Sequence, residues 1–210
     1  GGFSIVLYTG NGSDGATIGH GLSAAPELIM VKRRTFDQNW AVYHEGMGNT
    51  DNLELNTSDA KATGSAWWSD TTPSSTVITL GTEGRVNYNT GGYVAYCWHS
   101  VEGYSKFGEY TGNNDADGPM IYTGFRPKLI SIIKSTGGSY NVYDSARYTY
   151  NPVDAYVQWT AHDAQTTGYP IDFYANGFKL RTTGTGLNAS TTVYYYAAWG
   201  EIPFKYNSGF

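Results

Sequence analysis

Short apolar runs alternate with polar turns along the whole chain, and each run is too short for a typical helix. The aromatic run 93–98 alternates with a period of two residues, which places successive side chains on opposite faces of a strand, and the run 194–199 is similarly aromatic. Gly, Asn, Asp and Ser clusters separate the runs. We therefore predict strands near residues 5–8, 26–32, 40–44, 52–57, 76–80, 93–98, 106–110, 127–134, 140–144, 155–160, 170–174, 177–180 and 194–199.

The predicted strands occur as two similar sets. Tyr8-Thr9-Gly10-Asn11 returns at residues 110–113, and each copy is followed by a turn rich in Gly and Asp. The proline-led runs 26–32 and 127–134 correspond and are predicted to be central strands, because a proline is tolerated at the first residue of a strand. In the aromatic run at 40–44, Ala41 and Tyr43 should share one face and Trp40 and Val42 the other, and the run at 140–144 matches it in phase. The pattern indicates an internal duplication.

The duplication predicts two domains, at residues 1–103 and 104–210. Six or seven short strands in each half favour an all-β fold of two tandem β-sandwiches of jelly-roll type. The segment 99–105 between the copies is too short for a flexible linker, so we expect the two sandwiches to pack against each other. The chain begins Gly1-Gly2-Phe3 without a methionine, from which we expect a processed or excised piece of a longer chain.

Charge and composition exclude several classes of partner. The net charge is −5 and the Lys and Arg residues are scattered, so the basic patch on which nucleic-acid binding depends is missing from the sequence. No run approaches the roughly 18 apolar residues of a membrane span, so we expect no membrane insertion. Cys97 is the only cysteine, which rules out an internal disulfide, and its place in an alternating run predicts a small buried core residue.

One stretch has part of the pattern of a calcium loop. Asn113, Asp115 and Asp117 offer oxygen ligands at alternate positions before a glycine. The twelfth position of such a loop would be Gly124 in place of a bidentate glutamate. Clusters of Asx and Gly also form turns for local reasons, so a plain turn is the alternative to a Ca²⁺ site, and we predict no other cofactor.

Aromatic side chains give two candidate sites for a carbohydrate, because sugar rings stack on Trp and Tyr while polar groups bond the hydroxyls. If Trp67 and Trp68 are extended, one indole should face the core and the other should face solvent or a partner. A second polar and aromatic cluster comprises Arg147, Tyr148, Tyr150, Asn151 and Trp159, close to Asp154. Packing within or between the domains is the alternative for both.

Signals of catalysis are weak. The four histidines, His20, His44, His99 and His162, lack metal-ligand spacing and are expected to be ordinary surface or strand residues. Glycoside hydrolysis needs two facing carboxylates, for which Glu45, Glu54, Glu83, Glu102 and Glu109 are candidates that any β protein of this size would offer. No nucleophile elbow, phosphate-binding loop or dinucleotide fingerprint occurs. We predict that the protein is not an enzyme.

Several segments together resemble a known family. These are Tyr-Thr-Gly-Asn, 21–32, 39–44, the junction 101–108, Gly118-Pro119 and 122–127. They are similar to the duplicated β-sandwich of tail-fibre and other receptor-binding proteins of marine and environmental phages, over about residues 3 to 204. The resemblance implies a concanavalin-A-like sandwich on an extracellular or virion surface, and it brings no catalytic residues.

The sequence thus leads to two main hypotheses. The first is a non-catalytic, lectin-like adhesion module of a phage tail fibre that recognises a host-surface carbohydrate. The second is a structural subunit of an extracellular or virion filament, held by edge pairing of strands or by exposed aromatic side chains. Self-association is expected under both, and glycan hydrolysis is a third, less favoured alternative.

Overall fold

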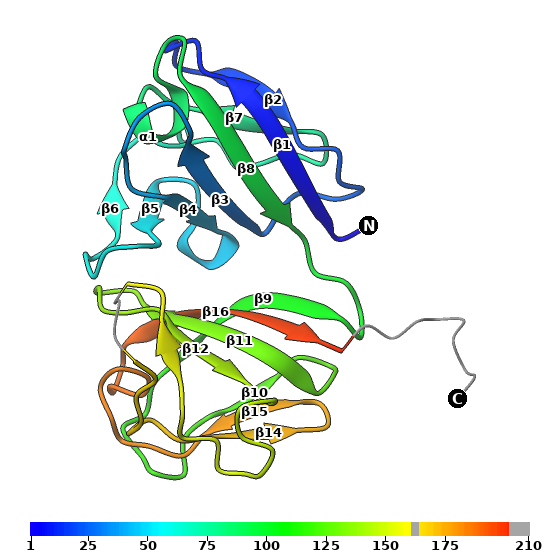
Figure 1. Cartoon of the computed structure of the whole chain (residues 1–210), viewed down its shortest axis with the longest axis vertical. Coiled ribbons are helices and arrows are strands. Elements are labelled where there is room, and N and C mark those ends of the chain that lie inside the picture. Colours follow the sequence, from blue (N-terminus) through cyan, green and yellow to red (C-terminus); the bar gives the residue numbers. More distant parts are fainter. Residues whose placement is uncertain (161–163, 202–210) are drawn as a thin grey trace. The chain divides into compact units, whose positions relative to one another are not determined.

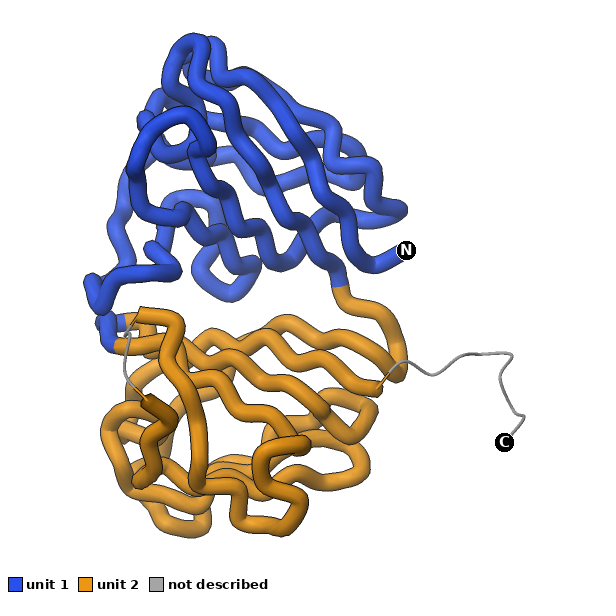
Figure 2. The backbone as a smooth tube through the Cα atoms, in the orientation of Figure 1, with its two compact units in different colours: residues 1–99, 136–138 blue, residues 100–135, 139–210 orange. Residues whose placement is uncertain are grey.

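The structure, a computed structural model, describes residues 1–160 and 164–201. The chain divides into two compact units (Figure 2). Unit 1 comprises Gly1–His99 with Thr136–Gly138, and unit 2 comprises Ser100–Ser135 with Ser139–Phe210. The predicted repeats at 1–103 and 104–210, and the predicted packing of one against the other, stay predictions.

Unit 1 contains a six-stranded antiparallel sheet and a two-stranded sheet (Figure 1). The large sheet has the order β1 (Phe3–Thr9), β8 (Gly92–Trp98), β3 (Leu28–Arg33), β4 (Ala41–His44), β5 (Asp51–Glu54) and β6 (Ala62–Thr63). The small sheet pairs β2 (Ala16–Gly19) with β7 (Val77–Leu80). The helices are short: a 3₁₀ turn η1 (Glu45–Met47) and one α-helical turn α1 (Gly84–Asn87).

Unit 2 contains a five-stranded and a three-stranded antiparallel sheet. The large sheet has the order β13 (Val157–Gln158), β12 (Asn141–Asp144), β11 (Pro127–Lys134), β16 (Val193–Gly200) and β9 (Ser105–Thr111). The small sheet has the order β10 (Met120–Tyr122), β15 (Gly177–Leu180) and β14 (Ile171–Tyr174). None of the helices in the described part of the chain is long and apolar enough to cross a membrane.

In each unit, one face of the large sheet packs on one face of the small sheet to form the core. In unit 1 the core joins Ala41 and Tyr43 of the large sheet to Ile78 and Leu80 of the small one. In unit 2 the core includes Ile130, Ile132 and Tyr143 from the large sheet and Ile121, Phe173 and Phe178 from the small one. The all-β prediction is confirmed. The predicted phase is also confirmed, because Tyr43 and Tyr143 both face a core.

The Tyr-Thr-Gly-Asn segments form equivalent corners in the two units. The hydroxyl of Tyr8 donates to the carbonyl of Val86 at 2.7 Å, and that of Tyr110 donates to Leu187 at 2.9 Å. The backbone N–H of Asn11 donates to Oδ1 of Asn87. The corresponding N–H of Asn113 donates to Oδ1 of Asn188 at 2.8 Å. The segment therefore fixes the end of the first strand of each unit to a buried asparagine.

Some elements have no clear signal in the sequence. Strands β2 and β10 are four and three residues long, and β6 has two residues. Runs this short complete at most two periods of alternation, so the pattern that predicts longer strands is weak for them. The α1 turn carries Gly84 and Asn87, which are poor helix formers, and it exists because the hydroxyl of Tyr93 and the side chain of Asn87 bond backbone groups around it.

Cys97 lies in the core of unit 1 with no exposed surface, as predicted. Burial raises the pKa of its thiol to about 12. The thiolate is the reactive species, so we expect almost no reaction with Ellman's reagent at pH 8 in the native state and one thiol per chain after denaturation. Absorbance at 412 nm measures both values. Fast reaction of the folded protein would contradict the buried placement of this strand face.

Candidate functional site

The Trp67-Trp68 pair is not extended. Both residues lie in a turn segment after β6, and their exposed fractions are only 7% and 0%. Trp68 meets the ring of Tyr43 edge to face, and the guanidinium of Arg85 lies 5.3 Å from the Trp67 ring. The expectation that one indole faces solvent is wrong, because the turn directs both rings into unit 1. Neither ring is available for a sugar to stack on.

The predicted cluster at 147–159 is exposed but dispersed. Tyr150 is 84% exposed, whereas Asn151 is held by two hydrogen bonds to the backbone of Phe173. Arg147 pairs with Asp144, and Trp159 stacks on Tyr140. Within the described ranges, no hydrogen bond, ion pair or ring contact joins any two of the five predicted residues. Binding by Arg147, Tyr148, Tyr150, Asn151 and Trp159 stays a prediction.

The predicted calcium loop forms a series of Asx turns. Oδ1 of Asn113 accepts from the N–H of Asp115, and Oδ1 of Asp115 accepts from the N–H of Asp117. The Asp117 carboxylate contacts Nζ of Lys179 at 2.8 Å and a guanidinium nitrogen of Arg181 at 2.7 Å. These two cations hold the pKa of the Asp117 carboxyl below its usual range, and Lys179 has the larger effect of the two. The geometry favours the turn alternative, and Ca²⁺ binding stays untested.

The histidines make local contacts. Nδ1 of His20 accepts from the N–H of Leu22, and Nδ1 of His44 accepts from that of Gly46. Nε2 of His99 lies 3.3 Å from the hydroxyl of Ser23. His162 lies outside the described residues. Among the residues that the structure describes, no three His, Cys, Asp or Glu side chains are placed to hold a metal ion together.

The small sheet of unit 2, whose strands are labelled β10, β15 and β14 in Figure 1, carries two exposed tyrosines. Tyr122 of β10 and Tyr174 of β14 are both opposite Gly177 of the central strand β15. Directly paired residues of antiparallel strands point to the same face, so the three form one row. Tyr122 is 69% and Tyr174 38% exposed. We call this row, with Asp172, Lys179 and Arg181 beside it, the tyrosine face.

Gly177 leaves the middle of this row without a side chain. A Cβ there would lie 2.0 Å from the carbonyl oxygen of Ile121, so β10 approaches too closely for any larger residue. The two outer strands are roughly 10 Å apart, a separation comparable to the width of one sugar ring. Gly177 itself is buried, and the Cε atom of Met120 lies 3.2 Å from that Cβ position, so the surface between the two tyrosines is formed partly by Met120.

Charged groups line the next row of the same face. Lys179 pairs in register with Asp172, on the side of the sheet away from the core. Oδ2 of Asp172 contacts the hydroxyl of Tyr174 at 3.2 Å and Nε of Arg181 at 3.3 Å. Asp117 completes the network through its contacts to Lys179 and Arg181. Hydrogen-bond donors and acceptors thus stand beside the aromatic row, which is the chemistry that a polyhydroxylated ligand requires.

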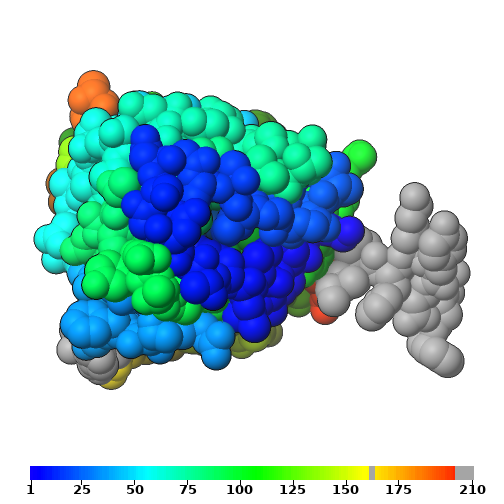
Figure 3. Space-filling model, turned by 90° about the horizontal axis from the view of Figure 1, so that it is seen from above, coloured from blue at the N-terminus to red at the C-terminus, as the bar shows by residue number. Residues whose placement is uncertain are grey.

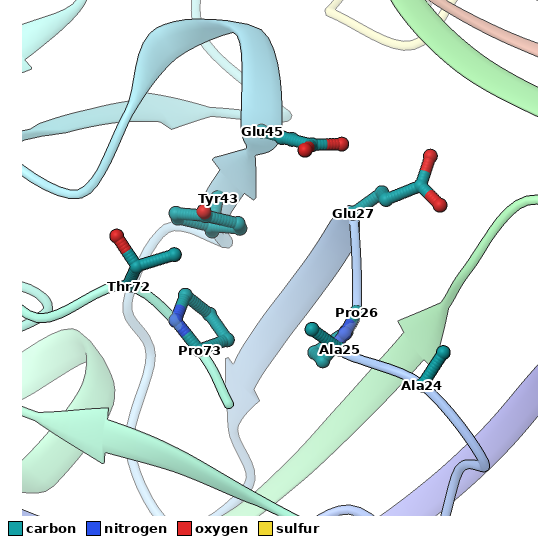
Figure 4. Close-up of a pocket in the computed structure, with 8 residues that line it drawn as sticks. All are labelled: Ala24, Ala25, Pro26, Glu27, Tyr43, Glu45, Thr72 and Pro73. Carbon is teal, nitrogen blue, oxygen red and sulfur yellow. The ribbon is translucent and has the colours of Figure 1, made fainter. Parts of the chain in front are cut away.

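Unit 1 has a separate pocket of about 250 Å³ (Figure 4). Pro26, Pro73 and the buried Tyr43 supply apolar walls, and Glu27 and Glu45 direct their carboxylates to the same side of it. The pKa of Tyr43 is raised to about 12, mainly by burial and to a smaller extent by the charge of Glu45. Of the candidate glutamates only Glu45 lines this pocket, while Glu54 and Glu83 pair with Arg85. The pocket is where the hydrolysis alternative can be tested.

The sequence did not indicate the tyrosine face. Tyr122 and Tyr174 are far apart in the chain, and only the pairing of β10 and β14 with β15 brings them together. One signal was available: Tyr174-Ala175-Asn176-Gly177 is a two-residue hairpin turn that predicts β14 and β15 as a pair. No corresponding signal identifies the third strand.

Comparison with family models gives one match, the domain of unknown function DUF7483, over residues 1–203. The chain belongs to the DUF7483 family. The match spans both units of the structure, so one DUF7483 domain comprises both sandwiches. No curated protein and no solved structure matches the chain.

Proposed function

We propose that this DUF7483 domain is a non-catalytic adhesion module that recognises a carbohydrate on a host surface, as part of a phage tail fibre. The observation that carries the proposal is the Tyr122–Gly177–Tyr174 row of unit 2. Solvent-exposed aromatic side chains beside charged hydrogen-bonding groups are the combination that sugar binding requires. The extracellular or virion location and the tail-fibre context rest on the sequence resemblance.

In this proposal the tyrosine rings contact the C–H faces of one sugar ring. Asp172 accepts hydrogen bonds from its hydroxyls, and Arg181 donates to its ring or carboxyl oxygens. Both groups are already oriented by their contact with each other and with Asp117 or Tyr174. Pre-oriented polar groups lower the entropic cost of binding, so the face needs no rearrangement to accept a ligand.

Binding to an array of bacterial lipopolysaccharides and capsular polysaccharides tests this function. We expect the wild-type domain to bind a restricted set of glycans, and Tyr122→Ala or Tyr174→Ala to weaken binding roughly tenfold or more. Tyr150→Ala is the matched control, because Tyr150 is a more exposed tyrosine of the same unit. Equal loss in the control, or wild-type binding to nothing on the array, would count against the tyrosine face.

The same samples separate binding from hydrolysis. A reducing-end assay on the bound polysaccharides should show no release over time. If the wild type releases reducing ends and Glu45→Gln does not, the protein is a glycan hydrolase and the adhesion proposal is wrong. The hydrolysis would then take place at the pocket of unit 1, where Glu27 and Glu45 lie together.

A further inference from the structure

Strand β1 is a long, uncharged strand at one edge of the large sheet in unit 1. It has seven residues, Phe-Ser-Ile-Val-Leu-Tyr-Thr, and pairs with β8 on one side. No strand in the described part of the chain pairs with its other side. The first residues of the chain, dark blue in Figure 3, lie at the surface of the molecule. An unblocked edge of this kind readily pairs with another strand.

The hydrogen bonds with β8 show which backbone groups of β1 point to the free edge. The carbonyl of Gly2 accepts from His99, and the N–H of Gly10 donates to Gly91. Residues with even numbers therefore bond to β8, because antiparallel pairing alternates. The N–H and C=O groups of Phe3, Ile5 and Leu7 point away from β8.

The same three residues have exposed apolar side chains. Phe3 is 47%, Ile5 58% and Leu7 66% exposed, all on the outer face of the sheet. Together they present on the order of 300 Å² of apolar surface, comparable to the largest patch of a typical monomer. Backbone groups and side chains thus both favour a partner strand at this edge.

The other edge strands of the two large sheets are protected by charge or by short length. Strand β9, which occupies the corresponding edge in unit 2, carries the exposed charges Lys106 and Glu109, and its Phe107 is buried. Strand β6, at the far edge of the sheet that contains β1, has only two residues. Charges and short length are the usual protections of an edge strand, and β1 has neither.

We propose that β1 pairs with β1 of a second copy of this chain, antiparallel and across a two-fold axis at Ile5. In such a pair the two identical strands run in opposite directions, and the apolar residues of β1 then lie opposite one another. When Ile5 lies opposite Ile5 of the second copy, Phe3 of each copy lies opposite Leu7 of the other. The register therefore contains three apolar pairs. Shifting the axis by one residue in either direction leaves two apolar pairs and places Gly1 or Thr9 opposite an apolar residue.

This pairing closes at two copies, because each copy uses the same edge for its partner. The dimer is independent of carbohydrate binding and differs from the filament alternative. The interface buries on the order of 1,000 Å² in total, at the low end for specific complexes, so the dimer should dissociate on dilution.

Analytical ultracentrifugation of the whole chain tests the proposal. We expect dimers at about 100 µM and monomers near 1 µM, and Leu7→Lys should weaken association roughly tenfold or more. Tyr122→Ala is the control that should dimerise like the wild type, which separates this proposal from the glycan site. Circular dichroism verifies that Leu7→Lys is folded. A wild type that stays monomeric throughout, or association that Leu7→Lys leaves unchanged, would refute the proposal.

Cysteine cross-linking tests the register. Paired residues at the axis have Cα atoms about 5.5 Å apart, within disulfide range, so Ile5→Cys should oxidise to a covalent dimer. Leu7→Cys should cross-link at least tenfold more slowly, because the two copies of residue 7 are roughly 13 Å apart. Cys97 is buried and does not interfere. Equal rates for the two variants would refute the register at Ile5.

Discussion

Asn188→Ala is expected to lower the free energy of unfolding of unit 2 by roughly 4 kcal/mol. The side chain is fully buried and uses all of its main hydrogen-bonding groups. Its Nδ2 donates to Thr182, Asp115 and Asn113 at 2.8–3.0 Å, and its Oδ1 accepts from the N–H of Asn113. Alanine removes all four contacts, and of their acceptors Oδ1 of Asn113 keeps the N–H of Asp115 as a donor.

Chemical denaturation followed by tryptophan fluorescence measures this loss. Asn176→Ala is the matched control, because Asn176 is exposed in the same unit, and its change should stay within about 0.5 kcal/mol. Asn87→Ala should have an effect similar to Asn188→Ala on unit 1, since Asn87 bonds Asn11, Ser13 and Gly81. A small effect at both asparagines would show that the corners do not hold the first strand of each unit in place.

Gly81→Ala should destabilise unit 1 by about 3 kcal/mol or more. A Cβ at this position would lie 2.2 Å from the carbonyl oxygen of Ala66 and 2.5 Å from that of Ser65. These are backbone atoms of the segment that carries Trp67 and Trp68. The segment is held by hydrogen bonds from Gly81 to Trp67 and from Glu83 to Ala66, so moving it would pull the buried Trp68 out of the core.

Gly84→Ala provides the control three residues further along. No atom lies within 4 Å of a Cβ at Gly84, which is the first residue of α1. Alanine there should be neutral or stabilise the unit by up to about 1 kcal/mol, because it reduces the conformational freedom of the unfolded chain. Thermal unfolding of the two variants should show a large loss for Gly81→Ala only. Similar melting temperatures would mean that the Trp67-Trp68 segment is not packed as described.

The long strands could be predicted from the sequence because each is an apolar, β-branched or aromatic run bounded by turn residues. The runs at 26–32, 93–98, 127–134 and 194–199 became β3, β8, β11 and β16, and these occupy the interior of the two large sheets. Burial alternates along β8, whereas much of β3, β11 and β16 is buried on both faces, which makes those runs continuously apolar. The two-residue and three-residue strands are too short to complete two periods, so they leave little pattern in the sequence.

The candidate site was harder to predict, because its residues come together only through strand pairing. Asp117 was selected as a calcium ligand on local spacing, but Lys179 and Arg181, distant in sequence, neutralise it. Trp67 and Trp68 were selected for their aromatic character, but the backbone of the turn at 64–70 directs both into the core. Local spacing gives neither the charge nor the exposure of a side chain.

The most direct test of carbohydrate recognition is an NMR titration of the isotope-labelled domain with an oligosaccharide that the array identifies. We predict that the backbone amides of Tyr122, Tyr174 and Gly177 shift together and saturably, along with those of Lys179 and Arg181. The amides around Tyr150, and those lining the pocket at Glu27 and Glu45, should not shift. Shifts confined to either of those two regions, with the tyrosine face unchanged, would contradict this prediction.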